Sequence, residues 1–98
     1  MTAYWIAHVT VHDAERYQRY RDLAPAAFNK YQATFLARSE QALTLEGESY
    51  GRHVLIAFPD YQTAVACYHS PEYQQARAAR ADIADIADAT IVITEGLA

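Results

Sequence analysis

The chain has 98 residues, enough for one domain over residues 1–98 and too few for two. Hydrophobic residues make up 52% of the chain and charged residues 20%, which excludes a disordered polypeptide. The net charge of −4 argues against a nucleic-acid partner, because neutralising phosphates requires a basic face.

The first predicted element is a strand over Tyr4–Val11, a run rich in aromatic and β-branched residues. Successive side chains of a strand point to opposite faces of the sheet. One face therefore receives Tyr4, Ile6, His8 and Thr10, and the other receives Trp5, Ala7, Val9 and Val11. Because both faces are largely apolar, we expect a central strand that is covered on both sides.

A helix is predicted after Asp13, whose carboxylate is a typical N-cap. Its apolar stripe recurs at helical spacing and consists of Tyr17, Tyr20, Ala24, Phe28 and Tyr31. Pro25 falls inside this pattern and removes a backbone hydrogen bond. We therefore expect a kink or a restart of the helix near Leu23.

The middle of the chain is predicted to form strands. A short strand covers Thr34–Arg38, and Ala42–Glu46 either continues it or forms a short extra strand before a turn at Gly47. The third main strand covers Arg52–Phe58. Pro59 ends it, because proline has no N–H to donate to a neighbouring strand.

The last third is predicted to hold a bent helical region and a final strand. Asp60 caps its first part, and Ser70 starts its second part, with proline and glutamate following as in many helix N-termini. The repetitive run Ala81–Ala89 marks no clean face and is expected to be helix tail running into loop. The final strand is predicted over Thr90–Thr94.

This order predicts a ferredoxin-like α+β fold, βαββαβ, with an antiparallel sheet and helices on one face. The other face of the sheet would then be a large exposed apolar surface, which usually marks an interface. We therefore expect a homodimer that buries the helix-free sheet faces against each other.

The sequence also resembles a known family. The pieces that carry the resemblance are YWIAHV at the start, FLAR at 35–38, LEG at 45–47, HVLIAFP at 53–59 and CYHSPEYQQAR at 67–77. Their order and spacing resemble the bacterial DUF1330 family of the dimeric α+β barrel superfamily, over essentially the whole chain. The resemblance implies a ferredoxin-like protomer and a sheet-to-sheet dimer, but no activity. One departure is Ser39-Glu40, where the family usually has glycines.

Two residues are the first candidates for a site. His8 lies mid-strand and could act as a general acid or base, although a core histidine with a hydrogen-bond partner is the commoner case. Arg38 ends the second strand and could hold a carboxylate, or it could pair with Glu40 or Glu46. We expect His8 and Arg38 to line one cavity, with Tyr20 or Tyr68 on its wall.

Two other local features have simple structural interpretations. The N–H groups after Ser70 could bind an anion, but Ser70 itself is the more usual partner. A salt bridge between Glu46 and Arg52 is expected across the Gly47 turn.

The remaining chemistry is defined by what the sequence lacks. Cys67 is the single cysteine, and His8, His12, His53 and His69 lack the close spacing of a zinc site, so no metal or other cofactor is expected. A nucleotide-binding or nucleophile motif is missing as well. No signal peptide or membrane span is recognisable, so a cytoplasmic protein that does not bind membranes is expected.

Three functions follow as hypotheses. The leading one is binding of a small, partly apolar metabolite between sheet and helices, with an acidic group on it as one option. The candidate binding residues are His8, Tyr20, Arg38, Tyr68 and Ser70. The alternatives are a non-catalytic dimeric interaction module and, by fold analogy alone, an enzyme like the cofactor-free monooxygenases or isomerases. The sequence leaves open whether the protein is an enzyme.

Overall fold

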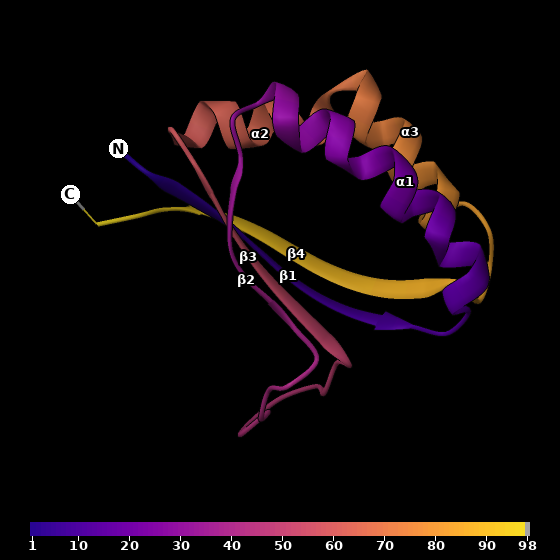
Figure 1. The fold of residues 1–98 in the computed structure, drawn as a ribbon. Helices are drawn as coiled ribbons and strands as arrows, with labels where there is room; N and C mark the ends of the chain where they lie inside the picture. The colour runs from indigo at the N-terminus through magenta and orange to yellow at the C-terminus, as the bar shows by residue number, and fades with distance from the viewer. Residues whose placement is uncertain (98) are drawn as a thin grey trace.

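The computed structural model describes residues 1–97, which form a four-stranded antiparallel sheet with three helices on one face (Figure 1). The elements in chain order are β1 (Ala3–Val11), α1 (Ala14–Lys30), β2 (Thr34–Ser39), β3 (Arg52–Phe58), α2 (Tyr61–His69), α3 (Pro71–Ala81) and β4 (Ala87–Glu95). The strands lie in the order β2-β3-β1-β4. The predicted ferredoxin-like α+β fold is therefore confirmed. No helix within residues 1–97 has the length and apolar character that crossing a membrane requires.

The two faces of the sheet follow from the alternation along β1, which lies between β3 and β4. Trp5, Ala7 and Val9 are buried beneath the helices, and the residues between them are half-buried on the other face. Register pairs Trp5 with Ile56 of β3 and with Ile93 of β4, so apolar side chains form rows across the sheet. We call the helix-free side the open face.

The helices start where the sequence predicts. Asp13 accepts a hydrogen bond from the backbone N–H of Arg16 at 3.0 Å, and Asp60 accepts one from Thr63 at 2.7 Å. Such caps satisfy backbone donors that have no partner within the helix. The expected restart near Leu23 is wrong, because α1 runs unbroken through Pro25. Burial of α1 side chains on both sides of the proline, such as Ala24 and Phe28, compensates for the lost hydrogen bond.

Two predicted strand boundaries are wrong. Ala42–Glu46 forms no strand: this loop projects away from the helices, and Leu43 and Leu45 are 81% and 83% exposed (Figure 1). At the other end of the chain, β4 starts at Ala87 rather than at Thr90. Alanine and aspartate are weak strand formers, but pairing with β1 overrides this preference, since Ala87 lies opposite Val11.

The turn before β4 is tied to the start of α1. Ile86 is buried, and its carbonyl accepts hydrogen bonds from the backbone N–H groups of His12 at 2.8 Å and Asp13 at 3.2 Å. Asp85 just before it has a φ of 65°, a left-handed conformation that aspartate tolerates better than most residues. Within the run Ala81–Ala89, the turn before β4 is therefore held to the start of α1 by these two hydrogen bonds.

A β-bulge in β2 decides which face its last residues occupy. Phe35 pairs with Ile56, but the register shifts before Ala37, so that Arg38 pairs with Val54. One extra residue in a strand reverses the alternation that follows it. Phe35 and Arg38 therefore both face the helices, although strict alternation would have separated them.

Candidate functional site

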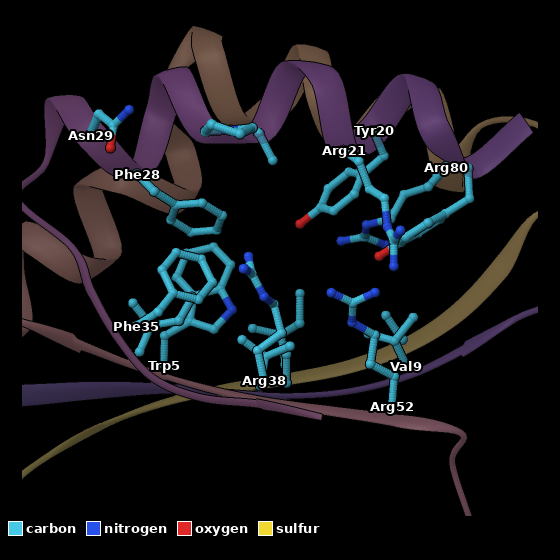
Figure 2. Close-up of a pocket in the computed structure, with 18 residues that line it drawn as sticks. Trp5, Val9, Tyr20, Arg21, Phe28, Asn29, Phe35, Arg38, Arg52 and Arg80 are labelled. Atoms are coloured by element: carbon cyan, nitrogen blue, oxygen red, sulfur yellow. The ribbon is translucent and has the colours of Figure 1, made fainter. Parts of the chain in front are cut away.

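A cavity of about 410 Å³ lies between the helix-covered face of the sheet and helices α1 and α3 (Figure 2). All four strands contribute to its floor, through apolar residues such as Trp5, Val54 and Ile91. Helix α1 forms its roof with Tyr20 and Phe28 among other residues. Apolar walls that also carry a few convergent polar groups are the general character of small-molecule sites.

Four arginines line this cavity: Arg21, Arg38, Arg52 and Arg80. They come from α1, β2, β3 and α3, and their guanidinium groups point into the space between sheet and helices (Figure 2). None of the 18 lining residues is Asp or Glu, and within residues 1–97 no carboxylate lies at salt-bridge distance from any of these four arginines. The wall therefore has one sign of charge. We call this space the arginine cavity.

Arg80 is the most deeply placed of the four and is only 7% exposed. Its Nη2 donates a hydrogen bond to the hydroxyl of Tyr73 at 3.0 Å, and its guanidinium lies over the ring of Tyr20 at 5.2 Å. Burial lowers the pKa of Arg80, but Tyr73, Tyr20 and Tyr17 together outweigh this effect, and the pKa is raised overall. Arg80 is thus a permanent buried cation whose charge no carboxylate in residues 1–97 neutralises.

Two tyrosines near Arg80, Tyr17 and Tyr20, are held in their neutral form by burial. Burial raises the pKa of Tyr20 well above its ordinary value of 10.0, and the nearby Tyr73 raises it further while Arg80 lowers it. Burial also raises the pKa of Tyr17, against the lowering effect of Arg80. The hydroxyl groups of Tyr20 and Tyr73 lie 3.2 Å apart. Tyr20 therefore adds a neutral polar group to the wall of the arginine cavity.

Arg38 lies at the sheet side of the arginine cavity, with its guanidinium 5.0 Å from the ring centre of Phe35. The alternative ion pairs with Glu40 or Glu46 do not form, and neither does the expected bridge between Glu46 and Arg52, because Arg52 faces the cavity. Arg38 and Tyr20 share the cavity, as the sequence predicted. Their role in binding stays a prediction.

His8 lies on the opposite face of the sheet, so the prediction that it shares a cavity with Arg38 is wrong. Alternation along β1 places His8 on the open face, and the bulge in β2 turns Arg38 to the covered face. The Nδ1 atom of His8 lies 2.8 Å from Nδ1 of His53, and its ring lies 5.8 Å from that of Tyr50. His8 thus has a polar partner in the chain, as a structural histidine does.

The other sequence candidates occupy separate places. Tyr68 lines a neighbouring hollow beside α2 and α3, and only Arg80, Ala89 and Ile91 line both that hollow and the arginine cavity. Ser70 is buried at the start of α3: its hydroxyl donates to the carbonyl of Cys67 at 2.6 Å and accepts from the N–H of Tyr73 at 3.1 Å. Ser70 therefore already satisfies the N–H that an anion would need.

Cys67 is a buried thiol and lies outside the arginine cavity. Burial raises the pKa of the Cys67 thiol to about 12, which leaves it protonated and unreactive at neutral pH. No group of three or more His, Cys, Asp or Glu side chains in residues 1–97 is placed to hold a metal ion.

Sequence reasoning missed three of the four arginines, namely Arg21, Arg52 and Arg80. A local signal existed for two of them. Arg80 lies seven residues after Tyr73, on the same buried side of α3, and Arg52 alternates in step with Val54 and Ile56. Nothing in the sequence indicated that these side chains meet, because they are held by elements that are distant along the chain.

A family model described as "Domain of unknown function (DUF1330)" matches residues 2–97 of this chain. The search of curated proteins found no match to this chain. Among solved structures, a protein of unknown function from Rhodopseudomonas palustris has a TM-score of 0.75 at 17% identity, covering 99% of this chain and 83% of that one.

Two further structures show the same fold at low identity. A dimeric protein of unknown function with a ferredoxin-like fold, from Bacteroides fragilis, has a TM-score of 0.61 at 13% identity, covering 97% of this chain and 96% of that one. SnoaB, a cofactor-independent oxygenase from Streptomyces nogalater, has a TM-score of 0.62 at 15% identity, covering 99% and 94%. At such identities the likeness extends to the fold and not to activity.

Proposed function

This chain belongs to the DUF1330 family, whose description assigns no function, and we propose that it binds a small, partly apolar anion in the arginine cavity. The observation that carries the proposal is the set of four arginines that line one cavity without any carboxylate. Like charges in a low-dielectric space repel one another, and a cavity with walls of one sign concentrates ions of the opposite sign.

The depth of Arg80 supports a bound anion rather than a loose ion atmosphere. A buried guanidinium loses hydration that one hydrogen bond to Tyr73 and one aromatic face only partly replace. An anion in the cavity would add acceptors for the guanidinium groups and the opposite charge. The apolar floor around Trp5 and Ile56 favours a ligand with an apolar part over a hydrated inorganic ion.

A thermal-shift screen of small carboxylates tests this function. A ligand in the cavity should raise the melting temperature of the wild-type chain, and Arg38→Ala should lose most of that rise. The matched control is Arg19→Gln, which removes a positive charge from α1 at a residue that does not line the cavity. A rise that survives in Arg38→Ala, or one that disappears equally in Arg19→Gln, would contradict the assignment.

We also propose that the protein acts as a homodimer through its open face. One row across this face consists of apolar residues: Ala37, Leu55, Ile6 and Val92 lie side by side on the four strands. Val92 is 51% exposed, and the β2–β3 loop adds the exposed Leu43 and Leu45 beyond the sheet. Two of these faces stacked on a two-fold axis would bury the row. Sedimentation at micromolar concentration should give a dimer, and a monomer would contradict the proposal.

The other hypotheses account for less of the molecule. A purely structural module would explain the apolar row but would leave four like charges without a purpose in the cavity. An oxygenase activity like that of SnoaB would rest on the fold alone, since the two chains are 15% identical.

A further inference from the structure

The arginine cavity has two chemically different ends, and the sheet shows how they are arranged. Trp5, Ile56 and Phe35 form one row across the covered face, while Val9 and Arg52 form another. Trp5 and Val9 are four residues apart on β1, which corresponds to about 13 Å along a strand. The aromatic residues of the floor thus lie at one end, and Arg52 lies at the other.

Helix α1 divides the roof in the same way, because it runs back over the sheet. Arg21 and Tyr20 line the cavity from the first half of the helix, and Phe28 lines it from the second half. Seven residues separate Arg21 from Phe28, or about 11 Å along a helix. Figure 2 shows this division, with Arg21, Arg52 and Arg80 on one side and Phe28, Phe35 and Trp5 on the other.

The aromatic end is a wall of rings that contact one another edge-on, which gives a ligand ring an aromatic surface to pack against. Phe28 stands edge-on to Trp5, with ring centres 5.2 Å apart, and edge-on to Phe35 at 5.4 Å. Trp5 and Phe28 are buried, whereas Phe35 lies at the exposed edge of the sheet. Arg38 lies over the Phe35 ring and therefore stands at the boundary between the two ends.

The cationic end holds three guanidinium groups from three elements, α1, β3 and α3. The tyrosines fix two of them, since Arg80 lies over Tyr20 at 5.2 Å and Arg21 lies over Tyr17 at 5.8 Å. One negative charge would leave this end strongly positive. A head group with two negative charges and several acceptor oxygens matches it better, because each guanidinium can donate two parallel hydrogen bonds.

We infer that the ligand is a planar aromatic molecule with a dianionic head group, a phosphate monoester or a dicarboxylate. This inference rests on the proposed anion-binding function and specifies its ligand class. The ring packs against the cavity-facing sides of Phe28 and Phe35, and the head group contacts Arg21, Arg52 and Arg80. Arg38 donates to the acidic group where ring and head group join.

Isothermal titration calorimetry at constant ionic strength tests the inference with four probes. Phenyl phosphate and phenylmalonate have both a ring and a dianion, benzoate has a ring and one charge, and inorganic phosphate has no ring. The two dianionic aromatic probes test the two kinds of head group, and at least one should bind about tenfold more tightly than benzoate or inorganic phosphate. Lowering the pH below about 6 should weaken the binding of phenyl phosphate, because its phosphate group then takes up a second proton and carries only one negative charge.

Variants at the two ends separate the two parts of the ligand. Arg52→Gln should lower the affinity for the preferred dianionic probe about tenfold and the affinity for benzoate by much less. Arg21→Gln is a second variant, at a more exposed residue, with the same expected effect. Phe35→Ala should weaken the aromatic probes and leave inorganic phosphate unchanged. Arg19→Gln, outside the cavity, should change none of these affinities.

The results of these titrations can contradict the ligand class without contradicting the proposed anion-binding function. If benzoate binds as tightly as both dianionic aromatic probes, the inference of a dianionic head group is wrong, whereas the proposed anion-binding function is retained. If inorganic phosphate alone binds, or if Phe35→Ala has no effect on the aromatic probes, the aromatic class is wrong. If no probe binds and the melting temperature does not respond to any carboxylate, both the inference and the proposed function are overturned.

Discussion

The two faces of the sheet are built from the same strands, but the helices within residues 1–97 cover only one of them (Figure 1). On β1, Trp5, Ala7 and Val9 face the helices and are buried within one chain. Ile6 and His8 lie between them on the open face, where the described chain provides no helix (Figure 1). In the function that we propose, the covered face binds a ligand in its cavity and the open face pairs with a second copy of the chain. Alternation along β1 places the proposed binding site and the proposed interface on opposite faces of the same strand.

Removing the central side chain of the covered face should have the largest effect. Trp5 is 1% exposed and packs against Phe28, Phe58, Tyr68 and Tyr73. Trp5→Ala should lower the free energy of unfolding by about 3–5 kcal/mol, because it removes buried area and leaves a cavity. Ile6→Ala, on the neighbouring residue of the open face, should cost less than half as much. Urea denaturation of both variants, at protein concentrations low enough for the chain to be monomeric, measures the difference, and equal losses would contradict the assignment of the faces.

Alkaline pH should destabilise the covered side of the molecule. The folded thiol of Cys67 has a pKa of about 12, against 9.0 for an ordinary thiol, since burial disfavours its anion. The unfolded chain therefore releases this proton first, so the stability is fully present below pH 9 and falls as the pH rises to about 12. The loss should reach up to about 4 kcal/mol for this group, and Tyr17 and Tyr20 act in the same direction.

The matched control for this pH dependence is Cys67→Ala. Its unfolding free energy should fall less steeply between pH 9 and pH 12 than that of the wild-type chain, because only the tyrosine part remains. Denaturation at several pH values measures both slopes. Identical slopes would show that the thiol contributes nothing to the alkaline loss.

A charge on the open face should separate the proposed dimer without affecting the cavity. Val92→Lys places an ammonium group in the apolar row of both copies and should raise the dimer dissociation constant about 100-fold, or about 2.7 kcal/mol. Gln75→Lys adds the same charge on exposed α3 and should leave the dimer intact. Sedimentation measures both variants. Loss of phenyl phosphate binding in Val92→Lys would show that the two faces are not independent.

The smallest effect is expected for Ser70, which caps helix α3 and does not contact the proposed ligand. Ser70→Ala should cost about 1 kcal/mol of stability, because the N–H of Tyr73 loses its cap. The affinity for phenyl phosphate should not change, because Ser70 does not line the arginine cavity. A tenfold loss of affinity with unchanged stability would instead place the anion at the start of α3.

The sequence by itself determined the parts of this protein that depend on local rules. The alternation of Tyr4–Val11 defined the two faces of β1, and side-chain caps defined where the helices begin. The order of elements and the family resemblance gave the ferredoxin-like fold, which the structure confirms. Periodicity and capping act within a few residues, so one chain is enough to detect them.

Only the tertiary structure decided what the cavity contains. The bulge after Phe35 reversed the alternation and turned Arg38 toward the helices, while His8 remained on the other face. Arg80 joined Arg38 from a helix more than forty residues away along the chain, and Arg21 and Arg52 came from two other elements. A sequence records the spacing of such residues but not the register and packing that bring their side chains together, because these depend on long-range pairing between strands and helices.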